Sequence, residues 1–158
     1  MKTPITRIYH DLDGVHADFE AGVKAITGGF PHQIEKRHMW KAINRKGDFF
    51  ESLKPLSDSR ELFEFTSTLK VEQLVLTGMP TIKDGAGQKT RWAHRYLRDD
   101  LEVIVLPSKQ KYLHAAPGRI LIDDRIDMIS AWSEAGGIGI LHTSAESTIA
   151  QLKPFFGL

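Results

Sequence analysis

The sequence contains no cysteine among its 158 residues. This absence excludes disulfide bonds, metal sites with thiolate ligands and a cysteine nucleophile, and it fits a reducing compartment. Long apolar runs are also missing, because no stretch approaches the roughly 20 residues that a membrane-spanning helix needs. The first residues, Met1-Lys2-Thr3-Pro4, lack the apolar region of a secretory signal. We therefore expect a cytoplasmic protein that does not bind membranes.

The chain also carries almost no net charge. Its 21 Lys and Arg residues nearly balance 20 Asp and Glu residues, which gives a formal net charge of +1 at pH 7. This balance provides no strong signal for nucleic-acid binding. Internal repeats, low-complexity tracts and linkers are missing, and the apolar fraction of 41% is ordinary for a globular domain. We expect residues 1–158 to form a single domain.

What the sequence does contain is organised around residues 8–15, Ile-Tyr-His-Asp-Leu-Asp-Gly-Val. The apolar run over residues 5–9 predicts a buried strand, and Asp11 and Asp13 follow it. Residues i and i+2 of an extended backbone point the same way, so both carboxylates should lean toward one spot. Two such charges need a cation or a shared proton. Gly14 allows a sharp turn and a close approach of the backbone to a ligand.

Downstream, short apolar stretches alternate with helical patterns. Further strands are predicted at residues 73–76, 101–106, 119–122 and 138–141, and helices near residues 18–27, 58–69, 89–97, 127–135 and 143–153. This alternation is typical of an α/β, Rossmann-like three-layer sandwich with a central parallel sheet. The polar and aromatic segment from Phe30 to about Lys54 lacks strand alternation, and we interpret it as a helical insertion that covers something.

Three of the predicted strands end in polar residues that could meet. These strand ends carry Asp11 and Asp13, then Thr77 and Gly78, then Asp123 and Asp124. In an open parallel sheet the site lies beyond the carboxyl ends of the strands, where the strand order reverses. Four carboxylates there form a hard oxygen site that suits Mg²⁺.

Thr77, the amides near Gly78 and one lysine, either Lys109 or Lys111, could hold the oxygens of a phosphate beside that metal. Such an arrangement indicates phosphoryl transfer, in which catalysis is mostly positioning and charge neutralisation. One carboxylate could attack phosphorus and form an aspartyl-phosphate that water then cleaves. The second aspartate would protonate the leaving oxygen and later activate the water.

The sequence resembles the haloacid dehalogenase-like (HAD) phosphohydrolases in four motifs, which occur in the order typical of that family. The matching segments are residues 11–15, residues 74–78, a downstream lysine and residues 121–124. Residues 11–19, 47–55 and 121–125 further resemble the deoxyribonucleotidase branch (5′-nucleotidase, C-type). Three features depart from that branch: Gly78-Met79-Pro80 after the threonine, His16 in place of an aliphatic residue, and an unexpected spacing between the lysine and Asp123. The spacing leaves the choice between the two lysines open.

The resemblance implies a role for each matching residue. Asp11 would be the nucleophile and a Mg²⁺ ligand, and Asp13 the general acid and base with its carbonyl on the metal. Thr77 and Gly78 would bind the phosphoryl group, while Lys111, or alternatively Lys109, would neutralise it. The metal site would be completed by Asp124 with Asp123 beside it, and which of these two binds the metal directly stays open. Residues 20–55 would be a small helical cap inserted after the first strand, from which Trp40, Phe49 and Phe50 could enclose a base.

The expected function is therefore a Mg²⁺-dependent phosphomonoester hydrolase whose substrate is a small phosphorylated molecule, with nucleotides as the first expectation. Another small phosphate or a nucleic-acid end would suit an open site equally. A catalytically silent HAD-like binding protein is a further alternative. A signalling receiver uses similar residues, but its acidic pair comes first and its acceptor aspartate lies mid-chain, which is not the order found here.

Overall fold

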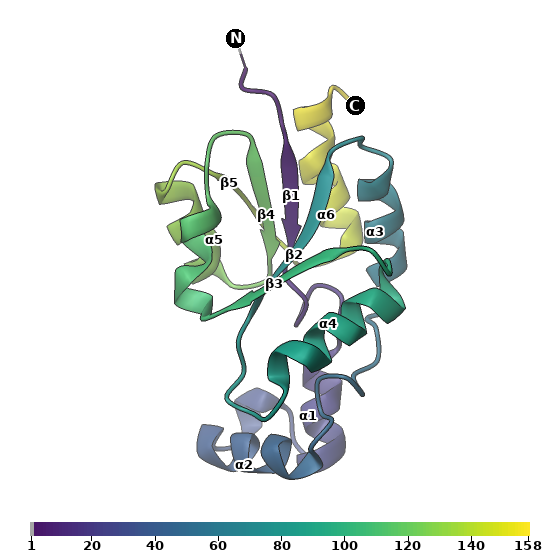
Figure 1. Cartoon of the computed structure of the whole chain (residues 1–158), viewed down its shortest axis with the longest axis vertical. Coiled ribbons are helices and arrows are strands. Elements are labelled where there is room, and N and C mark those ends of the chain that lie inside the picture. The colour runs from purple at the N-terminus through teal and green to yellow at the C-terminus, as the bar shows by residue number, and fades with distance from the viewer. Residues whose placement is uncertain (1) are drawn as a thin grey trace.

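The computed structural model describes residues 2–158 and contains a five-stranded sheet with helices on both faces (Figure 1). The strands are β1 (Arg7–His10), β2 (Glu72–Gly78), β3 (Glu102–Leu106), β4 (Arg119–Asp123) and β5 (Ile138–Leu141). The α-helices are α1 (Phe19–Thr27), α2 (Lys36–Lys46), α3 (Ser59–Ser67), α4 (Gly85–Tyr96), α5 (Ile126–Glu134) and α6 (Ala145–Leu152). Three 3₁₀ helices are η1 (Pro31–Gln33), η2 (Ser108–His114) and η3 (Lys153–Phe156).

The sheet has the strand order β3-β2-β1-β4-β5, and every neighbouring pair is parallel. The chain moves outward from β1 through β2 to β3, and then crosses back to place β4 and β5 on the other side of β1. The strand order therefore reverses beside β1, which is the position where open α/β sheets bind ligands. This arrangement confirms the predicted Rossmann-like fold class.

Alternating side chains of the strands pack on the two faces of the sheet. In β1, Ile8 joins the cluster under α3 and α6, whereas Tyr9 joins the cluster under α5. Trp132 of α5 is fully buried, packs edge-on against Tyr9 with ring centroids 5.3 Å apart, and donates a hydrogen bond from its indole nitrogen to the carbonyl of Arg119. Such an aromatic pair adds about 1 kcal/mol to the effect of burial alone.

The segment between β1 and β2 leaves the sheet and returns to the same place. Ala17 forms an antiparallel bridge with Pro55, and the amide of Asp18 donates to the carbonyl of Lys54 at 2.8 Å. Figure 1 shows α1 and α2 beyond the carboxyl end of β1, away from both chain termini. Helix α1 begins and ends where the sequence predicts, because the Asp18 carboxylate accepts from the amide of Ala21 and Gly28 adopts the left-handed conformation with φ 84°.

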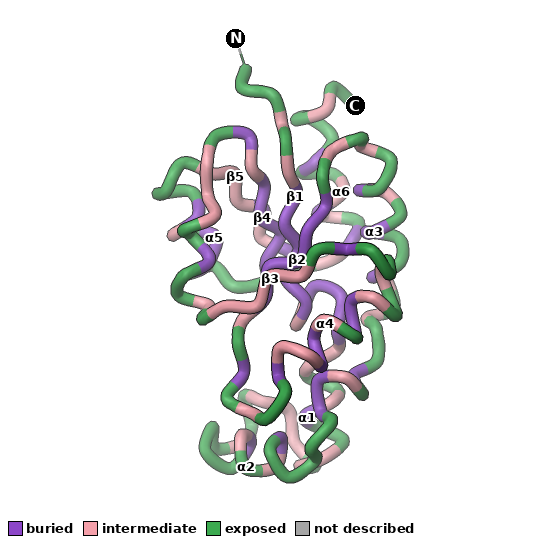
Figure 2. The backbone as a smooth tube through the Cα atoms, in the orientation of Figure 1, coloured by how far each residue is buried: buried purple, intermediate pink, exposed green. Residues whose placement is uncertain are grey.

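Burial follows the strands and thins out over the insertion (Figure 2). The backbone of β1, β2 and β4 is buried, whereas much of the outer surface of α2 is exposed. Among residues 2–158, no helix combines the length and apolar character that crossing a bilayer requires.

Three helix starts differ from the predicted pattern. Asp58 does not cap its own helix α3; its carboxylate instead accepts a 2.7 Å hydrogen bond from the amide of Ala145, at the first turn of α6. Ser144, rather than Thr143, is the N-cap of α6. Helix α4 starts at Gly85, four residues earlier than predicted. The capping-box spacing of Asp58 with Glu61 and of Thr143 with Glu146 predicts a cap for α3 and α6, but tertiary packing decides which backbone amide receives it.

The core beside β1 contains a chain of polar side chains. His10 and His16 are fully buried and lie 3.0 Å apart through their ring nitrogens. The other nitrogen of His10 contacts the Gln73 amide oxygen at 2.7 Å, and that of His16 contacts the Ser59 hydroxyl at 2.7 Å. Burial lowers the pKa of both rings, so both are neutral at pH 7. The histidine at position 16, which departs from the related branch, is thus a hydrogen-bonded core residue.

Candidate active site

The register of β1 on β4 brings the first and last acidic pairs of the sequence together. His10 pairs with Ile122, and the amide of Asp11 donates to the carbonyl of Ile122 at 3.0 Å. Asp11 therefore leaves β1 next to the point where Asp123 ends β4. One carboxylate oxygen from each of Asp11, Asp123 and Asp124 can be chosen so that all three lie within 4.8 Å of one another.

Gly14 makes room for this cluster. Its backbone has φ +84°, a conformation that side chains rarely adopt, and a Cβ atom there would overlap the carboxylate of Asp124. The glycine that follows the acidic pair is thus needed twice, for the turn after β1 and for the close approach of β4.

Lys111 neutralises part of the cluster. It extends from η2, is 3% exposed, and places its amine 3.0 Å from an Asp11 oxygen and 2.8 Å from an Asp123 oxygen. Burial alone would lower the pKa of Lys111, but the charges of Asp11 and Asp123 outweigh it and raise that pKa to about 12. The lysine is a cation throughout the physiological range. Lys109 is exposed and does not line the cavity, so of the two candidates the structure brings only Lys111 to the acidic cluster.

The remaining negative charge is not balanced by lysine. Burial, together with the charge of Asp11, raises the pKa of Asp123 and that of Asp124, the latter to about 7. Three carboxylates share one buried ammonium group, which leaves an excess of oxygen ligands and negative charge. Such a donor set fits a hard divalent cation such as Mg²⁺, which prefers oxygen ligands.

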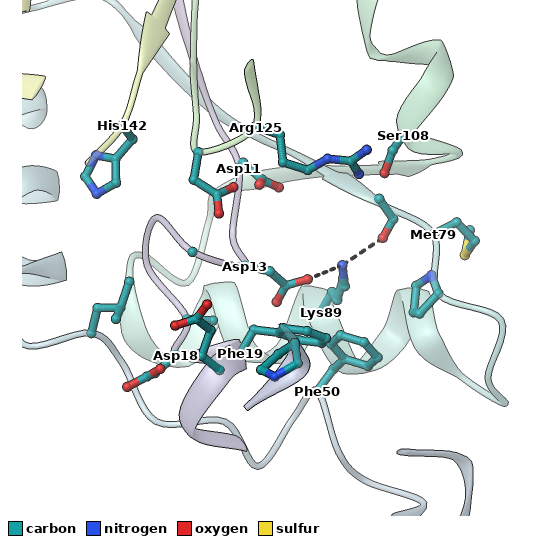
Figure 3. A pocket seen from close by; sticks show the side chains of 18 of the residues that line it. Asp11, Asp13, Asp18, Phe19, Phe50, Met79, Lys89, Ser108, Arg125 and His142 are labelled. Atoms are coloured by element: carbon teal, nitrogen blue, oxygen red, sulfur yellow. Dashed lines mark hydrogen bonds and ion pairs between the residues drawn. The ribbon is translucent and has the colours of Figure 1, made fainter. Parts of the chain in front are cut away.

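A second lysine, which the sequence reasoning missed, links Asp13 to the end of β2. Lys89 of α4 is 4% exposed, and its amine lies 3.0 Å from an Asp13 oxygen and 3.0 Å from the Thr77 hydroxyl. The same amine donates to the carbonyl of Gly78 at 2.8 Å and lies 4.8 Å above the centre of the Phe50 ring. Asp13 thus points toward β2, and its side chain does not join the other three carboxylates (Figure 3).

Most of these groups line one cavity of about 570 Å³ between the sheet and the inserted helices. Thr77 and Asp123 do not line it: both are fully buried and reach the site only through their contacts with Lys89 and Lys111. Trp40 and Phe50 contribute aromatic surface from the insertion, and Figure 3 shows Phe19 and Phe50 below Asp13 and Lys89. Phe49, which was expected to face a substrate, does not line the cavity. It is 1% exposed and packs edge-on against Phe19 and Phe50 in the core.

Further cavity residues were not predicted from the sequence. The polar ones include Lys89, Ser108, Arg125 and His142, which come from four different elements or loops. One signal was available for Lys89: with Gln88 it occupies the buried stripe of α4 that Trp92 and Ala93 continue. Two long polar side chains on an otherwise apolar helix face indicate a buried polar contact.

Comparison with known proteins gives a consistent result. No family model matches the chain. The human mitochondrial 5′(3′)-deoxyribonucleotidase is 28% identical over 94% of this chain and 75% of its own length. A Vibrio phage KVP40 protein described as a 5′(3′)-deoxyribonucleotidase is 28% identical over 78% of this chain and 69% of its own. A HAD-type hydrolase of Bacillus subtilis, solved with bound magnesium, superposes with a TM-score of 0.61 at 11% identity, covering 98% of this chain and 100% of that one.

The low identity of the solved neighbour shows the fold alone, whereas the curated relatives match between 78% and 94% of the chain in sequence. Together they confirm the resemblance that the motifs indicate. The chain has the HAD-like fold, and its sequence resembles the deoxyribonucleotidase branch of the HAD-like phosphatases.

Proposed function

We propose that the protein is a Mg²⁺-dependent phosphomonoester hydrolase that acts through an aspartyl-phosphate on Asp11. The observation that carries this proposal is the meeting of Asp11, Asp123, Asp124 and Lys111 at one end of the cavity. A carboxylate beside a buried ammonium group and further oxygen ligands is suited to attack a phosphoryl group whose charge those partners neutralise.

One oxygen each from Asp11, Asp123 and Asp124 would hold the metal, together with the backbone carbonyl of Asp13 that the family resemblance implies. A bound Mg²⁺ supplies charge neutralisation for the phosphoryl oxygens and the attacking carboxylate. The chemistry of the donor set supports this cation, because every available ligand is oxygen.

The phosphoryl group would be held between two lysines. Lys111 lies on the side of Asp11, and Lys89 lies on the side of Asp13, where it also contacts the hydroxyl of Thr77. Thr77 and the backbone at Gly78 would donate hydrogen bonds to the phosphoryl oxygens. Two ammonium groups on either side orient the phosphorus toward Asp11 and stabilise the charge that spreads over the oxygens in the transition state.

The reaction then takes two steps. An oxygen of Asp11 forms a bond to phosphorus while the bond from phosphorus to the leaving oxygen breaks, and Asp13 gives its proton to that oxygen. In the second step Asp13 takes a proton from water as the water oxygen attacks phosphorus and releases Asp11. Asp13 is placed for this exchange because it lines the cavity and is half-buried, so that it faces both substrate and solvent.

Nucleoside monophosphates are the substrates that the cavity supports best. Its volume of about 570 Å³ suits a ligand of this size. Trp40 is partly exposed and provides flat apolar surface that can stack on a base, while Phe50, only 2% exposed, closes the wall behind it. The relatives described as deoxyribonucleotidases add support from sequence. Residues 20–55, which carry both aromatic side chains, would act as the cap over the site.

Phosphate release from purified protein tests this proposal. We expect release from nucleoside monophosphates that depends on Mg²⁺ and stops with EDTA, and no release from Asp11→Asn. Asp48→Asn is the matched control, because Asp48 is exposed and pairs only with Lys46. Sugar phosphates and oligonucleotides with a terminal phosphate complete the panel. Stable protein that binds Mg²⁺ yet releases phosphate from none of these would contradict the proposal and favour a silent binding protein.

A further inference from the structure

Gly78 and Ser108 meet at the cavity wall in a way that the catalytic scheme above does not use. Gly78 ends β2 directly after Thr77, and Ser108 begins η2 after the neighbouring strand β3. A Cβ atom on Gly78 would overlap the hydroxyl oxygen of Ser108. The φ angle of Gly78 is not positive, so the backbone itself does not require glycine at this position. The serine hydroxyl therefore occupies the space that a side chain at position 78 would fill.

The helix η2 points Ser108 and Lys111 to the same side. A 3₁₀ helix has three residues per turn, so side chains at positions i and i+3 eclipse each other. Lys111 reaches Asp11 and Asp123, and both Ser108 and Lys111 line the cavity. Figure 3 shows Ser108 beside Met79 and on the side opposite His142. The serine hydroxyl thus lies against the end of β2, and it lines the same cavity as the lysine of its own helix.

We propose that Ser108 is a phosphate-binding residue whose hydroxyl donates a hydrogen bond to an oxygen of the phosphoryl group, next to the Thr77 and Gly78 contacts. This inference rests on the proposed phosphatase function, because the ligand is the phosphoryl group of that substrate. Position 78 is then glycine because the hydroxyl at this place comes from Ser108, after β3, and a side chain at the end of β2 would occupy the same space. The bond is made to the phosphoryl group and not to the nucleoside, so it serves every substrate equally.

The first test is Ser108→Ala. A hydrogen bond to a charged acceptor corresponds to about a 10- to 100-fold change in an equilibrium constant. We expect inorganic phosphate, followed by calorimetry and as a competitive inhibitor, to bind at least about 10-fold more weakly. The KM for a nucleoside monophosphate and that for p-nitrophenyl phosphate should rise by the same factor. Ser133→Ala is the matched control, since the Ser133 hydroxyl also packs over a glycine, Gly139, but outside the cavity lining.

The second test moves the hydroxyl across the contact. Gly78→Ala alone should weaken phosphate binding because its methyl group displaces Ser108. The double variant Gly78→Ser with Ser108→Gly relieves the overlap and returns a hydroxyl to the same space, so phosphate affinity should recover to within about threefold of the original. Gly78→Ala with Ser108→Gly relieves the overlap without a hydroxyl and should not recover. A purely structural role of Ser108 would let both double variants recover alike.

The outcomes separate the two proposals. Unchanged phosphate affinity and unchanged KM in Ser108→Ala, in an active enzyme, overturn the role of Ser108 and leave the phosphatase proposal standing. If the unaltered protein binds phosphate but hydrolyses no ester, the phosphatase proposal fails, and the comparison of phosphate affinities still decides the role of Ser108. Protein that neither binds phosphate nor hydrolyses an ester overturns both.

Discussion

Replacing Lys111 by methionine should destabilise the protein strongly, because the amine is buried between two carboxylates. Methionine keeps the length and apolar stem of the side chain and removes only its charge and donors. Lys111 is 3% exposed, and its two partners, Asp11 and Asp123, are both buried. Neither carboxylate can therefore regain full solvation when the ammonium group is lost. Breaking a buried ion pair in this way costs about 3–5 kcal/mol, a large part of the 5–15 kcal/mol that typically stabilises a domain.

Urea unfolding followed by circular dichroism measures this loss. At pH 7.5 without divalent cations, we expect Lys111→Met to lower the free energy of unfolding by about 3 kcal/mol with an unchanged slope against urea. Acid should reduce the deficit: the pKa of Asp123 is already raised to about 6 and rises further without the cation, so its charge destabilises the folded state above that pKa and stops doing so as the pH falls below it. Lys109→Met, an exposed neighbour on the same 3₁₀ helix, is the control. A loss below about 1 kcal/mol, or one equal to that of the control, would refute the assignment of Lys111 as the buried counter-ion.

Three further changes test separate parts of the site. Asp124→Asn should raise the melting temperature of metal-free protein above pH 7 and leave it unchanged near pH 4. The pKa of Asp124 rises from 3.8 to about 7 on folding, so its charge destabilises the folded state as the pH increases through that window. The variant should gain about 1 kcal/mol in the free energy of unfolding, because Asp124 is exposed to the cavity and solvent screens its charge. Lys89→Met should lower kcat/KM by about 100-fold in phosphate-release assays, because it leaves Asp13 and Thr77 without their shared partner; retention of more than half the activity would exclude that role. Gln88→Met should raise the KM for nucleotides without changing phosphate affinity. The Gln88 amide oxygen accepts a hydrogen bond from the amide of Phe50, so its loss should displace the Phe50 ring from the cavity wall. Trp92→Phe, which removes the bond to the Leu53 carbonyl instead, should affect stability alone, and equal KM values in the two variants would contradict this reasoning.

The sequence was sufficient to predict the sheet and the convergence of its strand ends. Strand β5 was predicted with its observed bounds, since a short apolar run between a Gly-Gly stop and a polar loop has few other interpretations. The meeting of Asp11 with Asp123 follows from parallel strands and the reversal of strand order, which the alternation of elements already implies. At these positions the local sequence pattern agrees with the global fold, and for this reason they can be predicted from the sequence.

The side chains that reach the cavity from helices could not be placed in the same way. The sequence narrowed one site lysine to Lys109 or Lys111 and left that choice to the structure, whereas Lys89 was not predicted, because a lysine on a helix is usually solvated until packing shows otherwise. Phe49 and Phe50 are adjacent aromatic residues that the sequence does not distinguish; in the fold, the amides of Phe50 and Glu51 donate to the Gln88 amide oxygen, a contact between segments far apart in the chain. Ser108 was missed because its importance depends on contact with Gly78, 30 residues earlier in the chain.

The role of Asp11 as nucleophile is the central claim of the proposed function. The rate of phosphate release from a nucleoside monophosphate, with Mg²⁺ and at equal protein concentration, should be compared for the unaltered protein and Asp11→Asn. We predict a loss of at least about 1,000-fold with the folded state retained, because the amide oxygen cannot form the aspartyl-phosphate. An Asp11→Asn variant that releases phosphate at the original rate would contradict the account.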